Sequence, residues 1–97
     1  MFGRSDNELS KPPIARDKGA TEILRVWGGA GLPQQCSLRT TWEDPGAWGL
    51  LLVDVARHAA QAYSQAGAMT VDDALARIKA LFDAEWAAPT DTPERLE

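Results

Sequence analysis

Few residues of this chain have side chains that could take part in chemistry. His58 is the only histidine, and Asp54 stands one helical turn before it in the segment TTWEDPGAWGLLLVDVARHAAQAY, residues 40–63. A carboxylate that holds an imidazole can support general base catalysis, and the i,i+4 spacing places both side chains on one helix face. This spacing alone defines no site, because such pairs are common on helices. We therefore expect Asp54 and His58 to be surface or edge-packing residues.

Cys36 is the only cysteine, so the chain can form neither an internal disulfide nor, with one histidine, a zinc cluster. It falls on the apolar face of an expected strand, where a free cysteine usually packs as a small hydrophobic residue. A nucleophilic role would need a neighbour that stabilises the thiolate, and nothing in the sequence places His58 there. A small hydrolase or lyase using Asp54, His58 and Cys36 is thus our third hypothesis. We expect no catalytic residue, metal or cofactor.

Arg25, Trp27 and Arg39 form the most informative group. In an expected β-hairpin they share one face with Ile23 and Thr41. Arginine beside tryptophan can stack a base or bind an anion, which indicates a ligand or partner contact. The alternatives are an arginine packed on its own tryptophan, or a face covered by another subunit. The nearby GGAG leads into a strand instead of a helix, so we expect a turn and not a phosphate-binding loop.

The elements that would position these residues follow from the pattern of apolar positions. The segments 21–27 and 35–42 are typical of strands, and GGAGLPQ between them contains turn residues. We expect a hairpin that pairs Trp27 with Gln35 and Arg25 with Ser37. One face of this hairpin then carries four apolar side chains: Leu24, Val26, Cys36 and Leu38.

Two amphipathic helices are expected after the hairpin. Asp44 is a suitable N-cap, Pro45 suits the first helical position, and Gly67 suits the stop. Thr70 would cap the second helix. The short AGAMT connection makes the helices antiparallel neighbours. The expected apolar stripes are Trp48, Leu52, Val55, Ala59, Ala62, Tyr63 and Ala66 in the first helix, and Val71, Ala74, Leu75, Ile78, Leu81, Phe82 and Trp86 in the second.

The predicted fold class is α+β, with a hairpin followed by two antiparallel amphipathic helices (β-β-α-α). Residues 1–19 are expected to form a flexible arm, residues 20–88 a single domain, and residues 89–97 a flexible tail that could end in a cloning scar. A domain of this size buries only about 60% of its extended-chain surface, so it is marginal alone. A two-stranded sheet also leaves two unpaired edges. We therefore hypothesise a homodimer, in which edge pairing across a two-fold axis completes the fold.

Composition limits the classes of function. The net charge of −4 argues against general nucleic-acid binding, which needs a clustered cationic surface. No apolar run approaches the length of a membrane span, and the N-terminus lacks a signal-peptide core, so we expect a cytoplasmic protein. The hydrophobic share of 44% and charged share of 25% are ordinary for a globular chain.

The segments EILRVW, GLPQ, TTWEDPGAWG and DVARHAAQAY resemble a family of short bacterial proteins, domain of unknown function 5076. The resemblance covers about half the chain. It implies a bacterial cytoplasmic origin and a small α+β domain, and it supplies no catalytic residues. Our leading hypothesis is a non-catalytic binding protein that self-associates and contacts a protein or a small ligand. The second hypothesis is a regulator that contacts nucleic acid or an anionic ligand through Arg25, Trp27 and Arg39.

Overall fold

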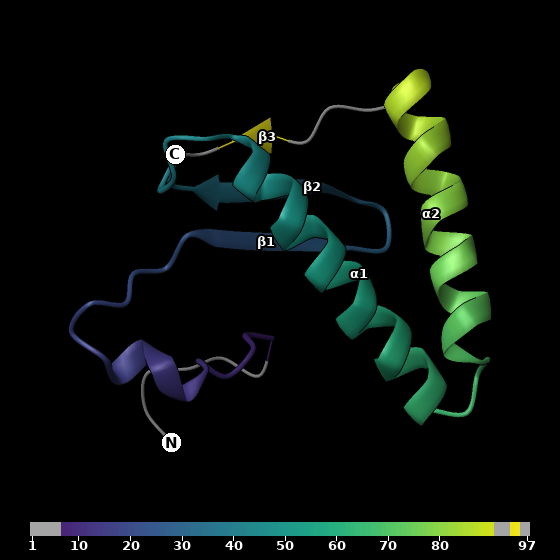
Figure 1. Cartoon of the computed structure of the whole chain (residues 1–97), viewed down its shortest axis with the longest axis horizontal. Helices are drawn as coiled ribbons and strands as arrows, with labels where there is room; N and C mark the ends of the chain where they lie inside the picture. The colour runs from purple at the N-terminus through teal and green to yellow at the C-terminus, as the bar shows by residue number, and fades with distance from the viewer. Residues whose placement is uncertain (1–6, 91–93, 96–97) are drawn as a thin grey trace.

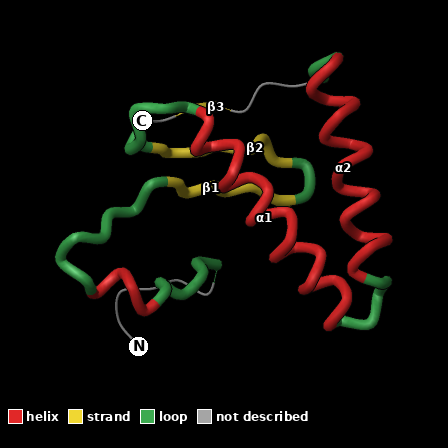
Figure 2. Tube along the Cα trace, viewed as in Figure 1, coloured by secondary structure: helices red, strands yellow, loops and turns green. Residues whose placement is uncertain are grey.

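The structure is a computed structural model that describes residues 7–90 and 94–95 (Figure 1). Its elements, in chain order, are the 3₁₀ turn η1 (Pro13–Arg16), β1 (Leu24–Gly29), β2 (Leu32–Leu38), α1 (Gly46–Gln65), α2 (Val71–Ala87) and β3 (Glu94–Arg95). The predicted α+β class and the β-β-α-α order are confirmed. Helix α1 crosses the sheet, and α2 lies beside α1 away from the strands (Figure 2).

The hairpin has the predicted register. β1 and β2 are antiparallel, with Trp27 opposite Gln35 and Arg25 opposite Ser37. Side chains alternate across a strand, so this register puts the apolar and the arginine-bearing positions on opposite faces of the hairpin, as predicted. The backbone N–H of Arg39 also donates to the carbonyl oxygen of Ile23 (3.0 Å).

The predicted strand bounds were wrong at both ends. β1 starts at Leu24 and runs through two glycines, and β2 ends at Leu38, before Thr40 and Trp42. Only Ala30 and Gly31 remain as a turn, and Gly31 has a φ of 74°, which glycine adopts without steric cost. The β1–β2 hydrogen-bond ladder extends into the GGAGLPQ segment. Its hydrogen bonds are made by backbone groups, and glycine has the same backbone N–H and C=O groups as other residues. The register shifts between Trp27 and Gly29, opposite Pro33, and a proline is tolerated at a bulge since it has no N–H.

A third strand comes from the C-terminal segment. β3 pairs in parallel with β2 at Gln35 and Cys36, which gives the strand order β1-β2-β3. The sequence left open whether the N-terminal arm would supply such a strand. In the arm, residues 13–16 form η1. Residues 1–6, 91–93 and 96–97, including the suggested cloning scar, lie outside the described residues.

The ends of α1 are set by local hydrogen bonds. The Asp44 carboxylate accepts from the N–H of Gly46 (2.8 Å), which is the capping contact expected of this residue. The helix is assigned from Gly46, one residue later than predicted, because i→i+3 bonds close its first turn. At the other end Gly67 has a φ of 80°, its N–H donates to the Ser64 carbonyl, and the next N–H donates to the Tyr63 carbonyl. These two bonds form a Schellman motif, which explains the stop.

Helix α2 starts where the sequence predicts. The Thr70 hydroxyl accepts from the N–H of Asp73 (3.1 Å), and Asp72 and Asp73 lie in the first turn. Acidic side chains are favourable there because the helix dipole makes the N-terminus positive. Neither helix in the described part has the length and apolar character needed to cross a bilayer.

The expected core is largely open. Within the described residues only Ala60 and Ala74 are fully buried hydrophobic residues. Leu52 and Phe82, which we expected inside, are each 44% exposed. The predicted stripe of α1 was partly wrong: it omitted Ala60, and its members Val55 and Tyr63 are 50% and 54% exposed. In α1 the residues that face α2 across the groove include Leu52 and Ala56, because the inward face is rotated from the predicted one. Among the described residues, no other element covers the large side chains at the open end of the helix pair.

Replacing Asp44 tests the start of α1. We expect Asp44→Ala to lower the free energy of unfolding by about 0.5–2 kcal/mol, because the Gly46 N–H loses its acceptor. Asp44→Asn is the matched control, since asparagine caps about as well as aspartate. Chemical denaturation at a fixed chain concentration measures both. Equal stability of the Ala and Asn variants would show that the side chain does not cap this helix.

Candidate functional site

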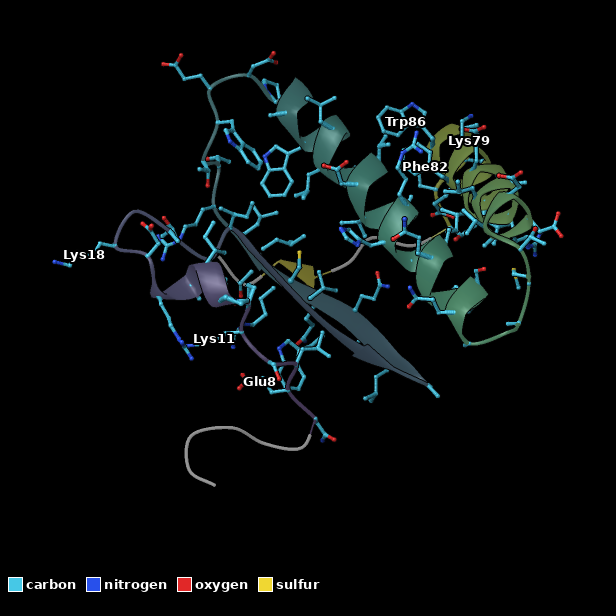
Figure 3. All side chains as sticks on the ribbon, turned by 60° about the horizontal axis from the view of Figure 1, so that its bottom comes forward. Glu8, Lys11, Lys18, Lys79, Phe82 and Trp86 are labelled. Carbon is cyan, nitrogen blue, oxygen red and sulfur yellow. The ribbon has the colours of Figure 1, made fainter. Side chains whose placement is uncertain are left out.

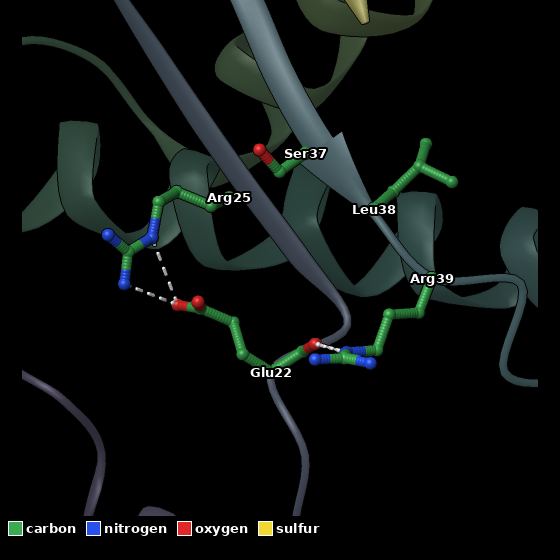
Figure 4. A pocket seen from close by; sticks show the side chains of 5 residues that line it. All are labelled: Glu22, Arg25, Ser37, Leu38 and Arg39. Carbon is green, nitrogen blue, oxygen red and sulfur yellow. Dashed lines mark hydrogen bonds and ion pairs between the residues drawn. The ribbon is translucent and has the colours of Figure 1, made fainter. Parts of the chain in front are cut away.

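The predicted contact residues surround a small recess on the hairpin. It has a volume of about 210 Å³ and is lined by Glu22, Arg25, Ser37, Leu38 and Arg39; we call it the hairpin recess (Figure 4). The structure thus brings Arg25 and Arg39 together, as predicted from their shared face. Trp27 is 44% exposed and is not among the lining residues.

Hydrogen bonds link both arginines to Glu22. The Arg25 Nε and Nη2 donate to the Glu22 carboxylate (3.2 and 3.1 Å), and the Arg25 Nη1 donates to the Glu8 carboxylate (3.3 Å). The Arg39 Nε donates to the backbone oxygen of Glu22 (3.1 Å). Exposed ion pairs of this kind typically contribute about 0–1 kcal/mol. Their main effect here is to offset the positive charge of Arg25, because its guanidinium pairs with two carboxylates.

The possible catalytic residues do not form a site. Asp54 and His58 lie exposed on α1, and within the described part of the chain neither has a hydrogen bond to the other. Cys36 is half-buried in β2, on the strand face predicted for it. No group of three or more His, Cys, Asp or Glu residues that could hold a metal occurs among residues 7–90 and 94–95.

A much larger hollow lies between the two helices. It has a volume of about 900 Å³, and we call it the helical groove. Its lining residues are Pro45, Gly46, Trp48, Gly49, Leu52, Val53, Ala56, Arg57, Leu75, Ile78, Lys79, Phe82, Asp83 and Trp86. Three of these are charged, and two of the three, Lys79 and Asp83, pair with each other at 2.7 Å. The wall of the groove is therefore almost entirely apolar.

The groove exists because the helices diverge. They are joined at the AGAMT connection and separate toward the start of α1 and the end of α2 (Figure 1). The buried alanines, Ala60 and Ala74, belong to the half of each helix near this connection, where small side chains allow close approach. Farther out the residues become large, and Figure 3 shows Phe82 and Trp86 on the side of α2 that faces α1.

Aromatic side chains line both walls of the groove, Trp48 on α1 and Phe82 and Trp86 on α2. On α1, Trp48 packs edge-on against Trp42, with ring centroids 5.5 Å apart. On α2, Phe82 and Trp86 stack at 5.7 Å, and Trp86 is 78% exposed. Stacked rings on one helix form a fixed apolar ridge. The sequence predicted the residues of this ridge but not its exposure, and the signal that could have indicated it was the small domain size.

Comparison with known proteins gives a family and a similar solved structure. A model of the family Domain of unknown function (DUF5076) matches residues 8–90. A solved structure from the photosynthetic bacterium Rhodopseudomonas palustrus CGA009, which carries the provisional name of a pyruvate dehydrogenase, is 39% identical. The match covers 100% of both chains with a TM-score of 0.72. No curated protein matches.

The family model spans the arm, the hairpin and both helices, so it includes every residue of the hairpin recess and of the helical groove. The resemblance inferred from the sequence is therefore confirmed. The chain belongs to the family Domain of unknown function (DUF5076).

Proposed function

We propose that this protein acts through binding, without catalysis, and that its working form is a homodimer. One observation carries the proposal: the chain exposes far more surface than a folded monomer of its size. A 10.5 kDa monomer is expected to expose about 5,400 Å². This chain exposes 8611 Å².

Part of the exposed surface belongs to large apolar side chains on the helices. Large hydrophobic side chains on the helices remain exposed, namely Leu50, Leu52, Val53, Val55, Tyr63, Leu81, Phe82 and Trp86. The radius of gyration, 15.5 Å, also exceeds the value of about 12.5 Å expected for a compact chain of this length. Contiguous apolar surface on a soluble protein marks an interaction site.

Stability favours the same conclusion. Ordering one residue costs about 1–2 kcal/mol of backbone entropy, and burial of apolar area must offset that cost across the chain. Two fully buried alanines and a set of half-buried side chains supply little of it. A second chain that covers the helices would provide the missing burial. Folding and association would then be one process, as in obligate dimers.

The absence of catalysis is part of the proposal. Asp54, His58 and Cys36 contribute no shared contact within the described residues, which leaves no paired acid and base to propose. The name of the Rhodopseudomonas structure describes that protein, and we do not extend a dehydrogenase activity to this chain. A bacterial and cytoplasmic setting is likewise proposed, supported by the bacterial origin of that structure.

The mass of the protein in solution tests the homodimer. Sedimentation equilibrium from low to high micromolar concentration should give about twice the 10.5 kDa chain mass. The thermal unfolding midpoint should also rise with chain concentration, because dissociation and unfolding are coupled. A mass of one chain at high micromolar concentration, with a midpoint independent of concentration, would remove the proposal.

The hairpin recess remains our predicted contact site for a small ligand. We expect no nucleic-acid binding there. Glu8 and Glu22 offset the charge of Arg25, and the whole chain is acidic. Fluorescence anisotropy of a labelled oligonucleotide at low salt should show no saturable binding. The regulator hypothesis would instead require binding that weakens steeply with salt and is lost in the double variant Arg25→Ala, Arg39→Ala.

A further inference from the structure

We infer that the helical groove receives a second copy of this chain, which seats the Phe82–Trp86 ridge of its own α2 between α1 and α2. The inference rests on the proposed homodimer and specifies where the two chains meet. By two-fold symmetry, each chain gives its ridge to the other and receives one in return. The result is a four-helix core made of two helix pairs.

The shapes of the ridge and the groove support this assignment. The groove is about 900 Å³ and open at the end where the helices diverge. The ridge stands on one wall of that same groove, and its outer residue, Trp86, is 78% exposed (Figure 3). An isologous contact uses the same patch on both subunits, so it needs a protruding part and a receiving part side by side. This surface has both.

The chemistry of the ridge is that of an interface centre. Tryptophan and other aromatic residues dominate the binding energy of interfaces when they enter a desolvated apolar pocket. The lining of the groove around Leu52, Val53 and Ala56 is aliphatic and would exclude water from a seated indole ring. Gly46 and Gly49 line the α1 side of the groove at its open end. Because they have no side chains, they leave room there for an aromatic ring to enter from outside.

Charges at the rim of the groove favour a copy of this chain as the occupant. Arg57 lines the groove, is exposed, and has no ion pair within the described residues, whereas Lys79 and Asp83 satisfy each other. In α2 the cations Arg77 and Lys79 precede the ridge, whereas the carboxylates Asp83 and Glu85 flank it. A second α2 laid in the groove therefore brings carboxylates toward Arg57. This contact opposes the repulsion between two chains that each carry a net charge of −4.

The area available matches what a stable dimer needs. Obligate homodimers bury about 2,000–5,000 Å² in total, or about 1,000–2,500 Å² from each chain. The surface in excess of a compact monomer is about 3,200 Å² per chain. Pairing of the free β1 edges, which the sequence suggested, involves a strand of only six residues and would leave both helices uncovered. Covering the helical groove would remove part of this excess, to which the exposed residues 9–19 of the arm also contribute.

Isotope-filtered NMR on mixed dimers of labelled and unlabelled wild-type chains identifies the interface without any substitution. We expect intermolecular NOEs from the Trp86 indole to the methyl groups of Leu52 and Ala56. Intermolecular NOEs confined to Leu24 and Val26 on the hairpin would overturn the groove assignment while leaving the homodimer intact. A wild type with the mass of one chain would instead remove the homodimer itself, and this assignment with it.

Substitutions measure the contribution of the ridge. Trp86→Ala should raise the dimer dissociation constant at least tenfold, because the indole is 78% exposed in the single chain and would lose its burial in the groove of the partner. Among the described residues, its ring contact is the stack on Phe82. Arg57→Glu should raise the dissociation constant by a smaller factor, and this factor should depend on salt concentration. Leu9→Ala is the matched control: Leu9 is an even more exposed apolar residue (90%) that does not line the groove, and its removal should change the constant less than twofold. An unchanged constant for Trp86→Ala would overturn the assignment.

Discussion

The divergence of α1 and α2 is the constraint on which the rest of this structure depends. The helices can approach closely only where Ala60 and Ala74 leave room, and both alanines are fully buried. Beyond them the large residues of both apolar stripes hold the helices apart, so the stripes line a groove and do not interlock. A chain with a larger core could tolerate such a groove as a ligand site. In this chain the groove exposes large apolar side chains of both helices, among them Leu52, Phe82 and Trp86.

The other elements serve to hold this helix pair in place. The Asp44 cap and the Trp42–Trp48 contact fix the start of α1 directly after the hairpin. The Schellman motif at Gly67 and the Thr70 cap set a connection so short that α2 must turn back beside α1. The hairpin carries the recess around Glu22. Local interactions therefore set where each helix begins and ends and make the two helices antiparallel neighbours.

The sequence predicts much of this fold because local rules determine it. Capping at Asp44 and Thr70, the glycine stop at residue 67 and the hairpin register all depend on neighbouring residues. The strand ends escaped prediction, since backbone pairing carried the ladder through glycines that were expected to form a loop. The contact between β3 and β2 escaped because nothing local in the tail indicates it. The exposure of Phe82 and Trp86 was not predicted for a different reason. Periodicity shows which side chains share a helix face, but it does not show what covers that face.

Among the candidate sites, the sequence located the hairpin recess through Arg25 and Arg39 but not the glutamates that offset the charge of Arg25. The helical groove, by contrast, depends on an angle between helices that no residue pattern specifies. Hydroxyl-radical footprinting of the wild-type protein at micromolar concentration measures most directly whether that groove is covered. We predict that Trp86 is protected from oxidation, although it is 78% exposed in the single chain. Oxidation of Trp86 as fast as that of a fully accessible tryptophan would contradict the covered groove.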